Sequence, residues 1–270
     1  MHVSCVSFRK IGDIMLITEL LEIDANKGEL ISIVGGGGKT SIMMRLAKEL
    51  KAAGKRVLIT TTTAIYVPGG RSIDRLLLGK SSFKEYIFLS SPTDGITAAA
   101  KFSDGVKLKG FEPGLIDSIR DLGIFDFILV EADGSRGAPI KAPGEHEPVI
   151  PMATDRVIGV IGLDCMGKKI YSQHVHRSEP FCKITGCAAG DYVSPWMVAR
   201  LIESEKGLFK GAPKGSKKYV FLNKAEGEHR RNAALETVDL LLGGSCHESD
   251  GLCAASLYLN KAFIKWSWER

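Results

Sequence analysis

Four consecutive glycines followed by a lysine and a threonine carry the clearest chemistry in this sequence. The segment 30–41 reads LISIVGGGGKTS, with an apolar stretch at 30–34 before the glycines and a helical pattern after them. Glycine adopts positive φ without a steric penalty, so a glycine backbone can approach a bulky anion closely. The N–H groups of such a loop, and of the helix that follows, point at phosphate oxygens. The segment therefore predicts a site for the phosphates of a nucleotide.

Roles can be assigned to the residues at the end of this loop. We expect the Lys39 ammonium group to reach the outer phosphates and the Thr40 hydroxyl to bind Mg²⁺. The common pattern, Gly-x-x-x-x-Gly-Lys-[Ser/Thr], requires glycine at position 33, where this chain has Ile33. A shorter form, Gly-x-x-Gly-Lys-Thr, fits from Gly35 and locally resembles the loop of Mur-type ligases; a flexible glycine linker is the alternative. The nucleotide-binding residues expected in this segment are Gly35, Gly36, Gly37, Gly38, Lys39, Thr40 and Ser41.

Two carboxylates, Glu131 and Asp133, follow another apolar stretch in the segment EADGSRG. A carboxylate at the end of a strand can hold Mg²⁺, or a water bound to it, beside the outer phosphate. We expect Glu131 to organise the water or the metal and Asp133 to bind Mg²⁺ together with Thr40. Arg136 and Lys141 could neutralise charge on the phosphate being transferred. A plain strand-end turn, in which Asp-Gly is common, is the alternative. The expected catalytic residues are Lys39, Glu131, Asp133 and Arg136.

A third polar segment could read the base of the nucleotide. Asn223, Lys224 and Glu226 follow the apolar stretch 219–222 and resemble the Asn-Lys-x-Asp motif of GTPases. In that motif an aspartate accepts two N–H bonds from guanine. Glu226 is one methylene longer than aspartate, so both ATP and GTP remain open as the nucleotide. We expect all three residues in the binding site.

The remaining polar groups leave more than one interpretation open. The four threonines at 60–63 could bind phosphate, a metal-bound water or an acceptor substrate, or they could simply extend a strand. The segment KAPGEHEP at 141–148 is either a switch or substrate loop or a solvated connector. His174 and His176 could be ligands on one face of a strand, or surface or substrate-facing groups.

These segments need a framework that brings the ends of several strands together. Apolar stretches that read as buried strands alternate with helical patterns, which predicts an α/β fold with a three-layer, mostly parallel sheet of P-loop NTPase type. Ligands bind at the carboxyl ends of such strands, where the polar motifs stand. We expect one domain, 1–270, with the motifs between 27 and 226. The expected strands are 30–34, 56–59, 86–89, 125–130, 156–163, 219–222 and 252–259, and the helices 42–53, 72–78, 112–122, 195–203 and 228–242, with a hairpin at 101–110.

Composition narrows the class of protein. The 270 residues are 44% hydrophobic and 25% charged, and no run of about 18 apolar residues suggests a membrane span. The first residues lack an uninterrupted apolar core, so we expect a cytoplasmic protein. The net charge of +5 comes from scattered lysines, which suit a polyphosphate ligand and do not require nucleic acid. We expect free thiols in place of a zinc site, because none of the cysteines forms Cys-x-x-Cys. The cysteines are Cys5, Cys165, Cys182, Cys187, Cys246 and Cys253.

Together the motifs resemble the YqeC family, whose members are regarded as accessory proteins of selenium-dependent molybdenum hydroxylases. The resemblance implies a role in maturing such an enzyme, with the molybdenum hydroxylase or its cofactor as a partner. The segment 129–151 is its most specific part, while Glu226 and the tail after 242 depart from the motifs. The matching stretches are VGGGGKTS (34–41), ITTTTAIYVP (59–68), LVEADGSRGAPIKAPGEHEPVIP (129–151), VIGLD (160–164), HRSEPF (176–181), ITG (184–186) and FLNKAE (221–226).

Three functions are compatible with these residues. The first is a Mg²⁺-dependent NTPase whose hydrolysis drives a switch during maturation of another protein. The second is a small-molecule kinase or ATP-dependent ligase, whose acceptor pocket should hold His174, His176 or Arg177. The third is a non-catalytic nucleotide-binding scaffold for a molybdoenzyme, in which Lys39→Ala would spare maturation.

Overall fold

A large mixed sheet forms the centre of the molecule. The computed structural model describes residues 16–67, 69, 72–79, 95–244 and 248–267. Within these residues the sheet has nine strands in the order β14-β13-β12-β10-β1-β8-β2-β5-β4, and all neighbouring pairs are parallel except β13 with β14. The strands are β1 (Glu29–Gly35), β2 (Arg56–Thr61), β4 (Arg75–Leu78), β5 (Gly95–Ala100), β8 (Phe127–Glu131), β10 (Arg156–Gly162), β12 (Lys217–Asn223), β13 (Gly251–Ser256) and β14 (Lys261–Ser267).

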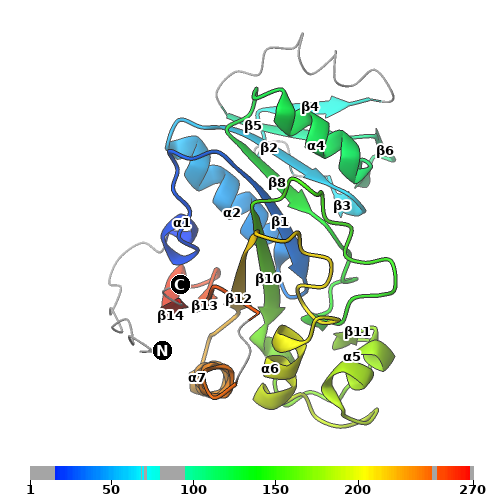
Figure 1. Ribbon diagram of the computed structural model, residues 1–270, viewed down its shortest axis with the longest axis vertical. Coiled ribbons are helices and arrows are strands. Elements are labelled where there is room, and N and C mark those ends of the chain that lie inside the picture. The colour runs from blue at the N-terminus through cyan, green and yellow to red at the C-terminus, as the bar shows by residue number, and fades with distance from the viewer. Residues whose placement is uncertain (1–15, 68, 70–71, 80–94, 245–247, 268–270) are drawn as a thin grey trace.

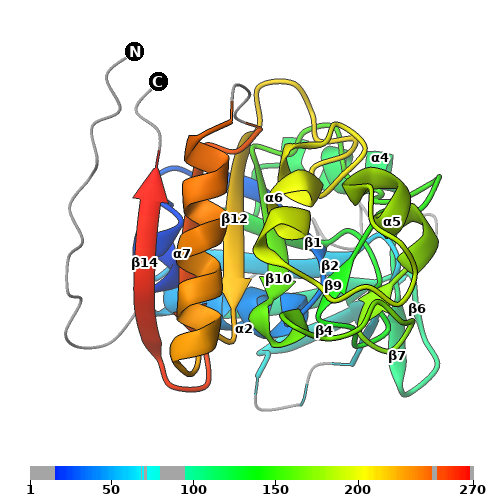
Figure 2. The same cartoon turned by 90° about the horizontal axis from the view of Figure 1, so that it is seen from below.

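Helices cover both faces of this sheet, which makes three layers (Figures 1 and 2). Alternate residues of β1 point to opposite faces: Ile31 and Ile33 join one apolar cluster and Val34 another. The first cluster includes α1 (Ile17–Leu20) and α2 (Lys39–Ala52). The opposite face is covered by α4 (Pro113–Asp121), α6 (Pro195–Glu203) and α7 (Glu228–Leu242).

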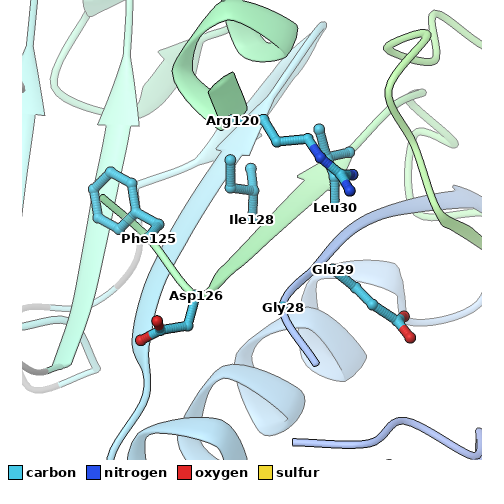
Figure 3. A pocket seen from close by; sticks show the side chains of 7 residues that line it. All are labelled: Gly28, Glu29, Leu30, Arg120, Phe125, Asp126 and Ile128. Atoms are coloured by element: carbon cyan, nitrogen blue, oxygen red, sulfur yellow. The ribbon is translucent and has the colours of Figure 1, made fainter. Parts of the chain in front are cut away.

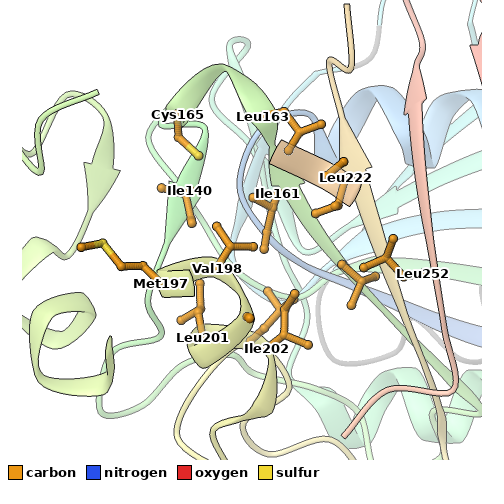
Figure 4. Packing of buried hydrophobic residues seen from close by; sticks show 14 of the residues in the cluster. Ile140, Ile161, Leu163, Cys165, Met197, Val198, Leu201, Ile202, Leu222 and Leu252 are labelled. Carbon is orange, nitrogen blue, oxygen red and sulfur yellow. The ribbon is translucent and has the colours of Figure 1, made fainter. Parts of the chain in front are cut away.

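Packing under α6 shows why the central strands are apolar along their whole length. Val198, Leu201 and Ile202 of α6 lie over Ile161 of β10 and Leu222 of β12 (Figure 4). Every residue of β10 is buried, as expected for a parallel strand covered on both faces.

Smaller elements lie around the carboxyl ends of the strands. β9 (Ile140–Lys141) pairs in parallel with β11 (Val175–His176), which leads into α5 (Ser178–Thr185). β3 (Ala64–Tyr66), β6 (Phe102–Ser103) and β7 (Lys107–Lys109) form a separate antiparallel group. A short 3₁₀ turn, η1 (Leu163–Cys165), follows β10.

The predicted α/β class and most of the predicted elements are confirmed. The helix predicted at 72–78 is wrong: this segment contains β4, which pairs with β5 and buries Leu77 while its neighbours stay more exposed. β5, β14 and α5 were not predicted, and the strand predicted at 86–89 lies outside the described residues. Among the helices that the structure describes, none has the length and apolar character needed to cross a membrane.

Candidate functional site

The predicted site residues come together at the carboxyl edge of the sheet. In the pairing register, Ile33 of β1 is beside Glu131 of β8, and Gly35 is beside Val160 of β10. Further along the sheet, Gly162 is beside Asn223 of β12. The glycine loop and the two carboxylates therefore lie at the ends of the adjacent strands β1 and β8, and the asparagine segment lies at the end of β12, which β10 separates from β1. All three are at the same edge, because strand ends in a parallel sheet share one edge.

The glycine loop is packed too tightly for side chains. A Cβ on Gly37, which has φ +79°, would lie 2.2 Å from the Gly162 nitrogen, and one on Gly38, with φ +128°, would lie 2.5 Å from Asn223 Nδ2. α2 begins directly after the loop, at Lys39. The first N–H groups of a helix have no partner within the helix, so this end of α2 can bind an anion.

Lys39 lies in a buried cluster of opposite charge. Its Nζ donates to the Gly35 carbonyl oxygen at 2.7 Å and lies 3.3 Å from Asp133 Oδ1 and 3.6 Å from Glu131 Oε1. The Thr40 hydroxyl donates to Glu131 Oε2 at 2.7 Å, and the Gly35 N–H donates to Asp133 Oδ2 at 3.1 Å. The side chain expected to bind phosphate is thus held beside both expected carboxylates.

Burial shifts the ionisation of Glu131 in this cluster. Burial raises the pKa of Glu131 above its usual value, although the Lys39 charge and the Thr40 hydrogen bond oppose that shift. Asp133 is 2% exposed, and among the described residues its Oδ1 accepts no hydrogen bond. A buried carboxylate oxygen of this kind needs a cation to compensate for its desolvation, and the Lys39 ammonium group 3.3 Å away supplies one.

The donor set suits Mg²⁺. Mg²⁺ binds through one or two carboxylates, waters and substrate phosphates, and seldom through an all-protein cage. Glu131, Asp133 and the Thr40 hydroxyl supply oxygen ligands of this type close together. In the part of the chain that the structure describes, no group of three or more His, Cys, Asp or Glu residues could hold a metal by itself.

Lys141 lies next to Asp133 in the buried part of the site. Its Nζ lies 3.0 Å from Asp133 Oδ2 and donates to Glu147 Oε2 at 2.6 Å and to the Gly134 carbonyl oxygen at 2.7 Å. The side chain is 1% exposed, so it is a buried bridge between Asp133 and the loop 141–148. Arg136, by contrast, is exposed and has φ +51°.

The asparagine segment reaches the glycine loop through one residue. Asn223 Nδ2 donates to the Gly37 carbonyl oxygen at 2.9 Å. Lys224 pairs with Asp164 Oδ2 at 2.7 Å. Glu226 accepts hydrogen bonds from the Ser256 hydroxyl and from Arg230. Of these three residues, only Asn223 forms a hydrogen bond with the glycine loop in the part of the chain that the structure describes.

Two of these partners, Asp164 and Ser256, were not predicted as site residues from the sequence. Asp164 follows β10, and the rule that ligands bind at strand ends could have found it. Its Oδ1 and the Oδ1 of Asn223 are buried without a hydrogen-bond partner in the described region. Ser256 ends β13, and nothing in its surrounding sequence marks it.

The threonines at 60–63 and the two histidines were each given more than one interpretation, and in the structure the threonines mainly form structural hydrogen bonds. Hydroxyls of Thr60, Thr61 and Thr62 donate to backbone oxygens of Ala99, Glu131 and Val149, respectively, so they tie β2 to its surroundings. His174 contacts Gln173 and His176 lies on β11. Free thiols in the described residues are Cys165, Cys182, Cys187 and Cys253, while Cys5 and Cys246 lie outside those residues.

A cavity of about 180 Å³ lies at the opposite edge of the sheet, under α4 (Figure 3). Its charged lining groups are already paired: Arg120 binds Asp155, and Asp126 binds Arg56. It has no connection with the glycine loop, because it is lined by the amino ends of β1 and β8. We therefore place the candidate site at the glycine loop.

Comparison with known proteins agrees with the motifs. The family model "YqeC protein" matches residues 31–179. The chain is also 39% identical over 200 residues to the uncharacterized protein YqeC of Escherichia coli strain K12, covering 72% of this chain and 75% of that protein. This chain belongs to the YqeC family. The matched range contains the glycine loop, both carboxylates and the loop 141–148, whereas Asn223 and Glu226 lie beyond it.

One solved structure has a weak overall likeness to this YqeC-family chain. The crystal structure of FtsY from Mycoplasma mycoides matches with a TM-score of 0.38 and 12% identity, over 92% of this chain and 67% of that chain. Similarity at that level supports no inference about the ligand.

Proposed function

We propose that this YqeC-family protein binds a nucleoside triphosphate with Mg²⁺ and hydrolyses it. The observation that carries the proposal is the cluster at the start of α2, where Lys39 and Thr40 contact Glu131 and Asp133 directly. A glycine loop, a lysine and a threonine beside two strand-end carboxylates form the arrangement that phosphoryl transfer needs.

Each residue has a proposed task. Lys39 leaves the Gly35 carbonyl oxygen and binds the outer phosphates, while the N–H groups at the start of α2 bind the others. Thr40 and Asp133 hold Mg²⁺, which supplies positive charge for the phosphate oxygens. Glu131 orients the attacking water.

The base site is proposed around Asn223, Lys224 and Glu226. Ser256 and Arg230 fix the Glu226 carboxylate, so this acceptor is held in one place. Both ATP and GTP remain candidates, since adenine and guanine each present N–H donors to a carboxylate.

The biological role is proposed from the family alone. We propose a cytoplasmic accessory factor for the maturation of selenium-dependent molybdenum hydroxylases, in which hydrolysis drives the handover of a cofactor or a selenium species. A kinase or ligase is the second candidate, favoured by the basic side chains next to the site.

A thermal-shift panel tests the nucleotide. Ligand at about 100 times its dissociation constant stabilises the folded state by about 2.7 kcal/mol. For a chain of this size that corresponds to a rise in melting temperature of roughly 5 to 10 °C. We expect ATP or GTP with Mg²⁺ to give this rise and CTP to give less, with phosphate release measured in parallel.

Two variants and one control complete the test. Lys39→Ala and Thr40→Val should lose both the shift and the hydrolysis. Lys183→Ala removes an exposed lysine of α5 and should behave like the wild type. If no triphosphate raises the melting temperature, or if hydrolysis survives both site variants, the assignment of this site is wrong.

A further inference from the structure

Two cysteines at the end of α5 lie with their sulfur atoms in contact. The Sγ atoms of Cys182 and Cys187 are 3.2 Å apart, and the Cys187 thiol donates to the Cys182 sulfur. Both are free thiols in this structure. A disulfide bond is about 2.05 Å long, so the two sulfurs need to approach by only about 1 Å to form one.

The contact follows from the way in which α5 ends. Gly186 has φ +74° and donates its N–H to the Cys182 carbonyl oxygen at 2.8 Å. A glycine in the left-handed region turns the chain back on the helix and often brings the next residue onto the last turn. That next residue is Cys187, and the residue that it meets is Cys182. Side chains other than glycine rarely adopt this φ, so Gly186 sets the geometry of the pair.

Contacts around the sulfurs hold the two cysteines in place. The Thr185 hydroxyl donates to the Phe181 carbonyl oxygen at 2.9 Å and lies 3.1 Å from Cys187 Sγ. Both cysteines pack against the apolar cluster that lies under α6. The thiols are therefore neighbours before any reaction, which lowers the entropy cost of joining them.

Exposure separates this pair from the other thiols that the structure describes. Cys182 and Cys187 are partly exposed, so a reagent in solution can reach them. Cys165 and Cys253 are completely buried, and burial raises the pKa of both thiols. A thiol reacts as its thiolate and must be accessible to the oxidant. Within the described residues, only the pair at the end of α5 combines access with a neighbouring thiol.

A metal site explains the pair less well than oxidation does. Structural zinc takes four ligands, and no three His, Cys, Asp or Glu residues of the described chain are grouped so that they could hold a metal. Burial, followed by the hydrogen bond and charge of Cys187 and the charge of Asp191, raises the pKa of the Cys182 thiol to about 11. That thiol keeps its proton at neutral pH, whereas a metal ligand must be deprotonated.

We propose that Cys182 and Cys187 form a site of reversible oxidation, at which a low-molecular-weight disulfide converts the two thiols into a disulfide bond. One cysteine thiolate attacks the oxidant, whose S–S bond breaks and releases one thiol. The second cysteine attacks the resulting mixed disulfide, releases the second thiol and completes the bond between the two cysteines. The two cysteine protons end on the two released thiols, and the oxidant gains two electrons. This chemistry does not involve the nucleotide site.

Peptide mass spectrometry tests the site directly. The full chain is equilibrated with oxidised glutathione at about pH 8, where more thiolate is present than at neutral pH. Free thiols are then alkylated, and trypsin separates Cys182, in the peptide 178–183, from Cys187, in 184–200. We expect these peptides joined and lighter by two hydrogens, at least about tenfold more abundant than any link to the buried Cys165 or Cys253. Excess reduced glutathione should return both peptides to the alkylated form.

Serine variants and a matched control complete the test. Cys182→Ser should leave Cys187 as a mixed disulfide with glutathione, because the thiol that would displace it is gone, and Cys187→Ser should do the same for Cys182. Glu179→Gln changes an exposed side chain of the same helix and should give the linked peptides like the wild type. Melting temperatures check that each variant is folded. If the wild-type thiols stay unmodified, carry glutathione without joining, or join another cysteine instead, the inference is overturned.

Discussion

Asp133 joins two buried lysines to the glycine loop. It neutralises two buried lysines, Lys39 at 3.3 Å and Lys141 at 3.0 Å, and it accepts the Gly35 N–H at 3.1 Å. In the proposed function, Mg²⁺ and phosphate would compete for these contacts, because one carboxylate cannot bind all of these partners at once. Asp133 also connects the glycine loop, through Lys141 and Glu147, to Arg177.

Asp133→Asn tests this role directly. Asparagine keeps the shape of the side chain but leaves the two buried lysines short of negative charge, so we expect a loss of about 3 kcal/mol in the free energy of unfolding. Urea unfolding followed by circular dichroism measures it. The matched control, Glu179→Gln, changes an exposed carboxylate paired with Lys183 and should leave the urea midpoint unchanged. An Asp133→Asn protein as stable as the control would show that the lysines do not need this charge.

His176 gives a pH dependence with a definite sign. Burial and the neighbouring cations Lys141, Arg177 and Arg136 lower its pKa below 6.5, with Glu147 opposing them. Between the lowered pKa and 6.5 the unfolded chain binds more protons than the folded chain, so stability falls as the pH falls through this window. We expect melting temperatures of the wild type to decrease more steeply than those of His176→Gln between about pH 6.5 and 5. Parallel curves would contradict a lowered pKa.

At the scale of elements, Arg156 anchors the start of β10 to the chain before β1. It is 1% exposed, pairs with Glu29 at 2.7 Å and donates to the carbonyl oxygens of Leu21 and Glu22. Its guanidinium also lies 4.8 Å from the ring centre of Tyr219. One side chain therefore joins α1, β1, β10 and β12 at the edge opposite the glycine loop.

Arg156→Met should cost about 3–5 kcal/mol in the free energy of unfolding, because it leaves the Glu29 carboxylate and the carbonyl oxygens of Leu21 and Glu22 without their donor. Urea unfolding provides the measurement. Arg156→Met with Glu29→Leu removes both charges, and we expect part of the loss to be recovered. If the double variant instead loses the sum of the two single losses, the two side chains do not interact.

Apolar runs made the central elements predictable, while long-range pairing decided the others. The ranges predicted for α6 and α7 agree with the structure. α6 has strong apolar periodicity and begins with Pro195, whereas the end of α7 is marked by Gly243 directly after it. β5, with the sequence GITAAA, has little strand propensity and is a strand because it pairs with both β2 and β4. Local sequence contains no information on such partners.

In the candidate site, too, residues at strand ends could be predicted, whereas contacts that depend on the fold of a loop could not. Glu131 and Asp133 could be anticipated because they end a buried strand, and the structure brings both to Lys39. The contact of Glu147 with Lys141 and Arg177 could not be anticipated, because it depends on how the loop 141–148 folds over β9 and β11. Their roles in binding and catalysis stay predictions.

At the scale of the whole molecule, the candidate site depends on strands from both halves of the sheet. Glu131 ends β8 and Asp133 follows it, whereas Asn223 ends β12 on the other side of β1. The glycine loop lies between them and is packed against both, through Asp133 and through Asn223. A nucleotide bound there would contact both halves, so its binding energy should stabilise the sheet as one unit.

We therefore propose that residues 1–270 form one domain that unfolds in a single transition. Cys165 and Cys253 report on opposite faces of the sheet, and burial raises the pKa of both thiols, so neither should react while folded. Since β1, β10 and β12 contribute to both clusters, neither helical layer can separate without exposing the other. Pulsed alkylation with peptide mass spectrometry should give both thiols the same urea midpoint, equal to that from circular dichroism as the control. Labelling of Cys165 at a clearly lower urea concentration than Cys253 would instead indicate two units that unfold independently.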